Sequence, residues 1–326
     1  MLATGPNGAG KTNLLEALHV ATQGFSPRTR TDRELVRFGD AASRIAVRGR
    51  RAGAPIGVEV TVEPGEPKHA TLNGAPLRPV ERLRSELATL VFTPDRLGIV
   101  KGAPAARRAY FDRALGRLIP ARAQLAADYG AAIAQRNASL RRISTGLSSV
   151  ASLEPWTLQV AELGAHLVGA RLEALALLES PFATHAAAFE LAGAGLRYLG
   201  EAPSAADLEQ RLSRDIERGV TGLGPHLHDV EISAQGRDLR SFGSQGEQRL
   251  AVLALLLAEA ELIAGRRGAP PLLLLDDVLS ELDPARRRTL AARVAGAGQT
   301  LITATDPAML PADPDQLVEV RPGTAR

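Results

Sequence analysis

The first residues able to do chemistry lie at the start of the chain, where glycines precede a lysine and a threonine. In order they are Gly5, Pro6, Asn7, Gly8, Ala9, Gly10, Lys11, Thr12 and Asn13. The spacing fits the phosphate-binding loop G-x-x-x-x-G-K-[ST] at every fixed position. Glycines let backbone N–H groups turn toward phosphate oxygens, and the helix that follows adds its positive end. Lys11 is predicted to reach the β- and γ-phosphates of ATP, and Thr12 to bind Mg²⁺. The alternative is a chance glycine-rich turn before a helix.

A second motif is a run of leucines that ends in two aspartates. Leu272–Leu275 is apolar at every position, which is typical of a parallel strand covered on both faces. Ligands bind at the carboxyl ends of such strands, so Asp276 is predicted to hold Mg²⁺. Asp277 is predicted to orient or deprotonate the attacking water, which makes Asp277 and Lys11 the candidate catalytic residues. The alternative is an ordinary buried strand that ends in two solvated carboxylates.

A third motif opens a long apolar helix predicted from about residue 246 to 264. Ser244, Gly246 and Glu247 resemble the S-x-G-[EQ] signature of ABC ATPases. In that family the signature binds the γ-phosphate of ATP held by the opposite subunit, so Ser244 would contribute a hydroxyl and Gly246 a backbone N–H. The alternative is a simple helix cap, with Glu247 as the capping-box partner. The position of the motif ahead of the leucine–aspartate strand favours the signature.

The segment after the two aspartates also resembles an ABC ATPase. Ser280–Asp283 is similar to the D-loop, which lies along the dimer interface of that family, and Asp283 is a candidate nucleotide-site residue. A transporter ATPase carries a switch histidine after the next strand, predicted at 300–304. Here a threonine takes that place, which argues against a transporter ATPase.

The elements around these motifs predict an α/β fold built from both ends of the chain. An ABC-type nucleotide-binding lobe is predicted from residues 1–93 and 223–326, with a helical insertion at 94–222. Predicted helices are 13–21, several between 104 and 191, 204–218, 246–264 and 284–295. Predicted strands are 88–92, 230–233, 272–275, 300–304 and 317–320, with an antiparallel region at 45–72 and a turn at Asn73–Gly74.

Composition excludes several classes of protein. The chain has 326 residues and no cysteine, so it has neither disulfides nor thiolate metal sites. No apolar run approaches the roughly 20 residues that span a bilayer, and no leader opens the chain, so a cytoplasmic protein without membrane contact is expected. A net charge of +3 permits a polyanionic partner. Scarce aromatic residues argue against an aromatic base-stacking platform.

Three further stretches narrow the resemblance to the RecF family of bacterial recombination mediators, ABC/SMC-like ATPases. The stretches are residues 94–104 continuing to Asp112, the segment Thr221–His226 with Asp229, and the segment from Asp276 to Leu290 that contains Arg286. The resemblance covers essentially the whole chain. It implies an ATP-dependent homodimer with Mg²⁺ that binds single-stranded or gapped DNA in replication, repair and the SOS response. It also implies RecO and RecR as partners, and slow ATP hydrolysis.

Asp277 is part of this resemblance, because it matches the family's aspartate where many relatives have a glutamate, and the shorter side chain is compatible with slow hydrolysis. One departure accompanies the resemblance. Family members carry about 30 further N-terminal residues, two strands around a turn, without which a sheet edge would stay unpaired. We therefore expect a longer natural protein, or poor stability of this chain alone. A non-hydrolysing ATP-dependent DNA clamp remains the main alternative function, and a transporter-type ATPase is a weaker one.

Arginines in the helical insertion are candidate DNA contacts. They are Arg107, Arg108, Arg113, Arg117, Arg141 and Arg142. Several lie three to five residues apart, so one helix face can present them to phosphates. The alternative is a solvated face with ion pairs to Asp112 and Asp128, or a bracing role for Arg107 and Arg108. His226 and His228 lack a third metal ligand. Glu16 is expected on the surface of its helix.

Overall fold

The computed structural model describes residues 1–29, 31–51 and 53–326. The chain forms two compact units, one of Met1–Arg96 with Leu256–Arg326 and the other of Leu97–Leu255. The first boundary lies close to the predicted one. The second lies beyond the predicted position at 222, because residues after it form a small sheet with a strand of the helical unit. This sheet has the order β7–β8–β9, and the strand Gly195–Leu199 (β7) was not predicted.

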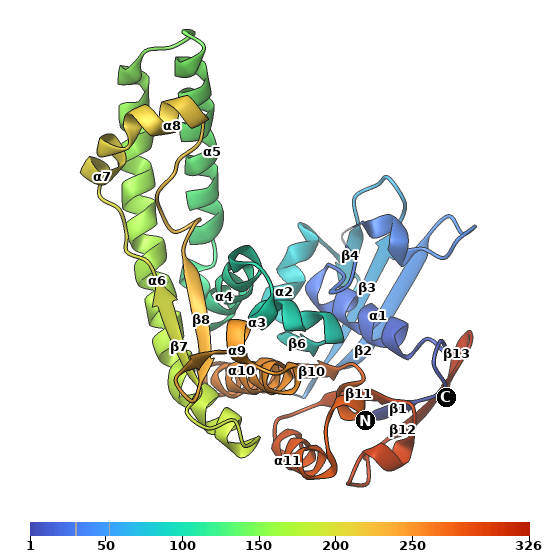
Figure 1. Ribbon diagram of the computed structural model, residues 1–326. Helices are drawn as coiled ribbons and strands as arrows, with labels where there is room; N and C mark the ends of the chain where they lie inside the picture. The colour runs from blue at the N-terminus through green and yellow to red at the C-terminus, as the bar shows by residue number, and fades with distance from the viewer. Residues whose placement is uncertain (30, 52) are drawn as a thin grey trace. The chain divides into compact units, whose positions relative to one another are not determined.

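The main sheet of the first unit has six strands in the order β13–β12–β1–β11–β10–β6 (Figure 1). They are β1 (Leu2–Thr4), β6 (Thr89–Phe92), β10 (Leu272–Leu275), β11 (Thr300–Ala304), β12 (Leu317–Arg321) and β13 (Thr324–Ala325). All neighbours pair in parallel except β12 and β13. Strand β1 is three residues long, fully buried, and lies between β11 and β12. The chain therefore leaves the middle of a parallel sheet directly into the glycine-rich loop.

Helix α1 (Lys11–Gln23) begins at the end of that loop. Its buried residue Leu15 packs with Val91, Leu274 and other apolar residues of the main sheet. The helix ends at Gly24, whose φ of 77° is left-handed and whose N–H donates to the carbonyl of Val20. This unit also contains α2 (Leu83–Glu86) and α11 (Pro284–Val294).

A four-stranded antiparallel sheet lies in the same unit, as the alternating pattern predicted. Its order is β2 (Ser43–Arg51), β3 (Ala54–Val62), β4 (His69–Leu72) and β5 (Ala75–Leu77), so β2 is an edge strand. The predicted turn is confirmed, with positive φ at both Asn73 and Gly74, as a type I′ hairpin requires. Alternate valines of β3 are buried in a cluster with Val20 of α1.

The second unit is mainly helical, as predicted. Its helices are α3 (Gly98–Lys101), α4 (Pro104–Leu118), α5 (Leu125–Ser144), α6 (Glu154–Ala188), α7 (Ala205–Gln210), α8 (Leu212–Arg218) and α9 (Leu239–Phe242). The helix α10 (Gln245–Arg267) begins in this unit and ends in the other. Its sheet contains β7, β8 (Asp229–Ala234) and β9 (Arg237–Asp238). The single helix predicted over 204–218 is divided at Arg211, and its predicted cap, Ser204, forms a capping box with Asp207.

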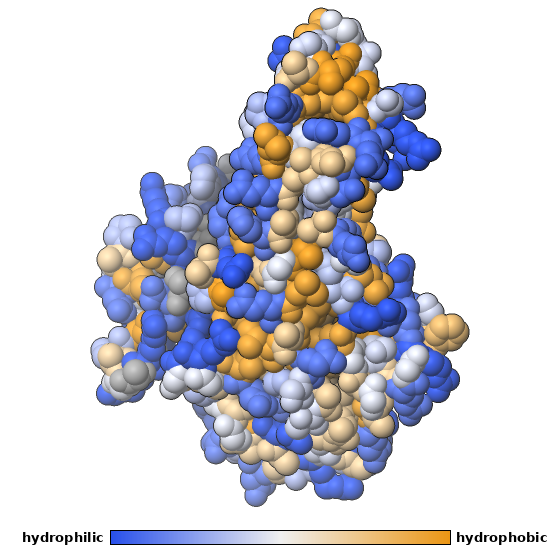
Figure 2. Space-filling model, turned by 90° about the vertical axis from the view of Figure 1, so that its left-hand side faces the viewer, coloured by the Kyte–Doolittle hydropathy of each residue, from blue (hydrophilic) through white to orange (hydrophobic). Residues whose placement is uncertain are grey.

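Helices α5 and α6 run side by side as a long antiparallel pair, with α7 and α8 lying across them (Figure 1). A shared core of this unit includes Tyr129, Val160 and Leu208. Hydrophobic surface lies near the free end of the helical pair (Figure 2), where Leu147, Val150 and Leu158 are exposed. Among the described residues, no helix combines the length and apolar character needed to cross a membrane.

Candidate nucleotide site

The glycine-rich loop has a backbone that only glycine adopts easily at several positions. Gly8 and Gly10 have left-handed φ values of 81° and 105°. A side chain at Gly5 would place its Cβ 2.2 Å from the carbonyl oxygen of Val320, so β12 excludes any larger residue there. The N–H of Ala9 donates to the carbonyl of Pro6 at 3.2 Å and tightens the loop. The sequence motif therefore has the backbone geometry that a phosphate cradle requires.

Lys11 is only 8% exposed, and its ammonium group points back into this loop. Its Nζ donates to the carbonyls of Gly5, at 2.7 Å, and Pro6, at 3.0 Å. No carboxylate of the described residues lies within ion-pair distance of this Nζ. A buried ammonium that has only carbonyl partners is poorly compensated, so this position favours an anionic ligand.

Three elements bring oxygen atoms together around Asp276, which is 5% exposed at the end of β10. The hydroxyl of Thr12 donates to Asp276 Oδ1 at 3.1 Å, and the hydroxyl of Thr303 donates to the same atom at 2.7 Å. Hydroxyl and carboxylate oxygens suit Mg²⁺, which usually keeps several waters and takes phosphate oxygens as further ligands. The oxygen atoms of Thr12 and Asp276 therefore fit a Mg²⁺ ion shared with phosphate. In the described part of the chain, no group of three or more His, Cys, Asp or Glu could hold a metal.

Asp277 has an unusual backbone and an unsatisfied side chain. Its φ of 48° lies in the left-handed region, which costs energy for a residue with a Cβ. The N–H of Asp277 donates to Thr303 Oγ1 at 2.9 Å, and this bond helps to hold the conformation. Its buried Oδ1 has no hydrogen-bond partner among the described residues. A strained residue with a free carboxylate oxygen, next to Asp276, is suited to receive a proton from water.

Thr303 is a site residue that the sequence argument missed. It lies within the strand predicted at 300–304, whereas the threonine at the place of a switch histidine follows that strand. In the fold its hydroxyl connects Asp276 and Asp277, because β11 lies beside β10. Thr305, two residues on, is exposed and its hydroxyl meets only the sulfur of Met309, at 3.6 Å. The sequence feature that could have identified Thr303 is a polar residue on a strand face that is otherwise apolar.

The predicted signature segment forms the N-terminus of α10. Glu247 N–H donates to Ser244 Oγ at 3.2 Å, and Ser244 N–H donates to Glu247 Oε2 at 2.7 Å, so the capping box of the alternative interpretation is present. Ser244 and Gly246 remain exposed, and a Cβ at Gly246 would meet only Ser244 Oγ, at 3.9 Å. The cap therefore leaves the positive end of the helix open to an anion.

Gln248 is a second residue that the sequence argument did not single out. It is 4% exposed, and its side-chain amide donates to the carbonyls of Leu239, at 2.9 Å, and Gly243, at 3.1 Å. These bonds tie the short helix α9 and the loop after it to α10. Gln248 therefore fixes the backbone that leads into Ser244.

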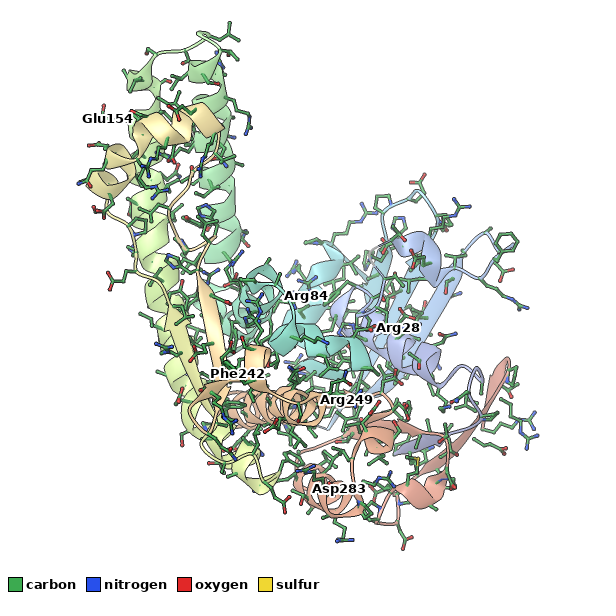
Figure 3. All side chains as sticks on the ribbon, in the orientation of Figure 1. Arg28, Arg84, Glu154, Phe242, Arg249 and Asp283 are labelled. Carbon is green, nitrogen blue, oxygen red and sulfur yellow. The ribbon has the colours of Figure 1, made fainter. Side chains whose placement is uncertain are left out.

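The remaining predicted residues of this region lie at helix ends. Asp283 is exposed at the start of α11 (Figure 3), and a hydrogen bond from the backbone N–H of Arg286 lowers the pKa of its carboxyl. Asn13 accepts a long hydrogen bond from Arg28, at 3.4 Å.

The expectation that Glu16 lies on the helix surface is wrong, because the chain after α1 folds back over it. Glu16 is 8% exposed, accepts the hydroxyl of Ser26 and pairs with Arg28 at 3.2 Å.

The structure corrects one of the predicted DNA contacts. Arg107 is 2% exposed and forms a two-bond pair with Asp229, with both distances at 2.7 Å, while it also donates to the carbonyls of Val100 and Gly102. Its guanidinium group is too deeply buried to contact a phosphate. Its hydrogen bonds to Asp229 hold α4 against β8. Arg108 is half-buried and donates to the carbonyl of His228 at 2.6 Å.

The other predicted DNA contacts stay predictions. Arg113, Arg141 and Arg142 are exposed, and Arg117 is half-buried. Arg141 donates to the carbonyl of Gly219 at 3.3 Å. Asp112, an ion-pair partner in the alternative interpretation, forms a two-bond pair with the buried Arg171, at 2.8 and 2.9 Å.

His226 is part of an internal hydrogen-bond network. Its Nε2 lies 2.9 Å from the carbonyl of Thr221, which can only accept, so Nε2 carries the proton and Nδ1 accepts from the hydroxyl of Tyr129 at 2.8 Å. Burial lowers the pKa of His226 and favours this neutral form. Both ring nitrogens are occupied, which leaves none for a metal.

We expect Arg136→Met to destabilise the helical unit by about 3–5 kcal/mol, since it would leave a buried carboxylate without its cation. Arg136 is fully buried and pairs with Asp215, itself 1% exposed, at 2.9 Å, while it also donates to Thr221 at 2.8 Å. Urea unfolding followed by circular dichroism measures the effect. The matched exposed variant Arg142→Met should change stability by less than about 0.5 kcal/mol. Equal stabilities of the two variants would contradict the bracing role of Arg136.

Fold and site together define a class of protein. A family model described as the RecF/RecN/SMC N terminal domain matches residues 1–325. The Smc head domain derived from Pyrococcus furiosus has the same fold, with a TM-score of 0.57 at 16% identity over 100% of this chain and 88% of that one. The chain thus belongs to the RecF, RecN and SMC group and has the α/β fold of its N-terminal domain.

Relatives of higher identity narrow this class. The chain is 40% identical to the DNA replication and repair protein RecF of Symbiobacterium thermophilum, over 98% of this chain and 90% of the relative. It is 37% identical to the RecF of Heliobacterium modesticaldum, over 92% and 85%. A solved structure titled as the recombination mediator protein RecF-ATP in the RecFOR pathway matches with a TM-score of 0.88 at 28% identity, over 100% and 90% of the two chains. The chain belongs to the RecF family.

Proposed function

We propose that this protein binds ATP with Mg²⁺ at the candidate nucleotide site, dimerises on ATP and acts on single-stranded or gapped DNA in replication and repair. The proposal depends on one observation: Lys11 lies inside the glycine-rich loop, and Thr12 at its end is hydrogen-bonded to Asp276, which precedes Asp277. The names of its relatives support DNA repair as the process and ATP as the nucleotide. RecO and RecR are the proposed protein partners, as the name of the RecFOR pathway suggests.

In the proposed dimer each copy binds one triphosphate with Gly8–Thr12 and covers the partner's triphosphate with Ser244–Gly246. The exposed N-terminus of α10 supports this arrangement. An open helix end attracts an anion, and that anion can be the triphosphate bound to the partner copy. Asp277 then deprotonates or orients the attacking water, and the strained position of a short carboxylate is compatible with slow hydrolysis. A non-hydrolysing clamp remains the second candidate, because it would use the same phosphate contacts.

Sedimentation velocity of the purified chain tests this proposal. Without nucleotide and with ADP the protein should sediment as a monomer, whereas ATP should produce a dimer that binds a labelled gapped duplex. A dimer of equal stability in all three conditions would refute ATP gating. Absence of measurable ATP turnover, with dimerisation and DNA binding intact, would favour the clamp.

A further inference from the structure

Positive charge is concentrated in one part of the chain, residues 28–51, which we call the basic segment. It contains eight arginines against the carboxylates of Asp32, Glu34 and Asp40, and therefore carries a net charge of +5. The arginines are Arg28, Arg30, Arg33, Arg37, Arg44, Arg48, Arg50 and Arg51. The whole chain carries only +3, so everything outside this segment is net negative. The charge of this segment therefore favours the binding of a polyanion.

Most of these guanidinium groups face solvent. In the described part of the segment, every arginine from Arg33 onward is exposed. Arg44 pairs with Glu59 at 2.7 Å and Arg51 with Glu86 at 2.8 Å, and the four side chains are between 36% and 69% exposed. Such pairs contribute little and are readily exchanged for a phosphate. No ion pair among the described residues involves Arg33 or Arg37.

The edge strand β2 arranges part of the basic segment as a row. Side chains alternate along a strand, so Arg44, Arg48 and Arg50 lie on one face. The exposure pattern agrees over Ser43–Arg48, where Ile45 and Val47 are half-buried between exposed positions, and every residue from Arg48 to Arg51 is exposed. A row of guanidinium groups along one strand matches the repeated charges of a nucleic-acid backbone better than a single anion.

An aromatic side chain stands beside this charge. Phe38 is 101% exposed, the highest value among the large hydrophobic residues that the structure describes. It occupies a tight turn in which Asp40 N–H donates to the carbonyl of Arg37 at 3.0 Å and Gly39 has a left-handed φ of 92°. The turn therefore holds a phenyl ring in water next to Arg37.

We propose that residues 33–51 form a contact for DNA with unpaired bases, in which the arginines bind phosphates and Phe38 stacks on a base. Binding of single strands commonly combines a basic track with aromatic stacking, whereas an acidic protein would not require a fully exposed ring between arginines. Phe38 is a lone aromatic, which is consistent with the small aromatic content of the chain. The inference rests on the proposed function for the identity of the polyanion. It adds a contact in the nucleotide-binding unit to those predicted on the helices.

Fluorescence anisotropy with a labelled gapped duplex and an intact duplex of the same length tests the stacking contact, with the full chain and ATP present. Phe38→Ala should weaken binding of the gapped duplex about 10-fold, as expected for loss of one stacked base, and should leave the intact duplex within about 2-fold. Phe38→Trp keeps an aromatic ring at this position and should bind the gapped duplex with the wild-type affinity. The exposed residue Leu172, on α6, provides the matched control, since Leu172→Ala should change neither affinity. Equal binding by Phe38→Ala and wild type would overturn the stacking contact.

Salt dependence tests the phosphate contacts. The double variant Arg33→Ala, Arg37→Ala should bind both DNAs more weakly, and the slope of log affinity against log salt should become shallower by about 1.5. Arg267→Ala, an exposed arginine at the end of α10, is the control and should keep the wild-type slope. Unchanged slopes in the double variant would overturn the inference.

Dimerisation separates this inference from the proposed function. Both sets of variants should still dimerise with ATP in sedimentation, because the altered residues lie outside the candidate nucleotide site. If the wild type dimerises and binds DNA but the variants bind it equally well, only the inference fails. If polyglutamate of equal charge competes as well as single-stranded DNA, the segment binds acidic protein and the inference also fails. If the wild type does not bind DNA at all, the proposed function fails with it.

Discussion

Lys11→Ala should lower the affinity for ATP by about 100-fold and abolish ATP-dependent dimerisation. A charged hydrogen bond to phosphate contributes about 1.5–3 kcal/mol, and the Lys11 ammonium is the only cation that the glycine-rich loop itself provides. Two backbone carbonyls hold this ammonium group inside the loop, at 2.7 and 3.0 Å. Isothermal titration measures the affinity, and sedimentation velocity with saturating ATP measures the dimer.

The chain offers a close control for this substitution. Lys101 is exposed on α3, outside the glycine-rich loop, and Lys101→Ala also removes one positive charge. It should retain ATP affinity within about 2-fold, since exposed charges are screened by water and salt. If Lys11→Ala dimerises with ATP as the wild type does, the loop does not control dimerisation and the proposed function is wrong. Thermal unfolding of both variants without nucleotide checks that neither loses its fold.

The second large effect is expected for Asp277→Asn, which should slow single-turnover ATP hydrolysis by about 100-fold or more while ATP-bound dimers accumulate. Asparagine keeps the size of the side chain and removes its ability to take a proton. The buried Oδ1 of Asp277 has no partner among the described residues, so its loss should not break an internal hydrogen bond. In the proposed site Lys11 and Thr12 bind the nucleotide, so ATP binding should persist in this variant.

Asp313→Asn, at an exposed position outside the site, is the matched control and should hydrolyse ATP at the wild-type rate. A rate for Asp277→Asn within about 2-fold of wild type would assign the water to another residue. Thr303→Val provides a further check. It removes the hydroxyl that bonds both Asp276 Oδ1 and the N–H of Asp277, and should reduce hydrolysis without removing either carboxylate.

The sequence by itself determined the elements whose local pattern is strong. The glycine-rich loop, the leucine–aspartate strand and the turn at Asn73–Gly74 each depend on residues a few positions apart, and all three occur as predicted. The same is true of the helices between 104 and 188, since their composition favours helix throughout. The two motifs together also predicted that Thr12 and Asp276 lie close to each other, because the carboxyl ends of parallel strands meet at one edge of the sheet.

The tertiary structure decided what depends on partners far away in the sequence. Arg107 and Arg113 are both arginines of α4, yet one is buried against Asp229 and the other is exposed, which helix spacing alone did not reveal. The role of Thr303 required β11 to lie beside β10, and Glu16 became internal only because the chain after α1 folds back over it. Likewise, Phe38 is unremarkable in the sequence. A turn places its ring in solvent next to Arg37, and the edge strand that follows exposes further arginines, since burial and strand order are set by the whole fold.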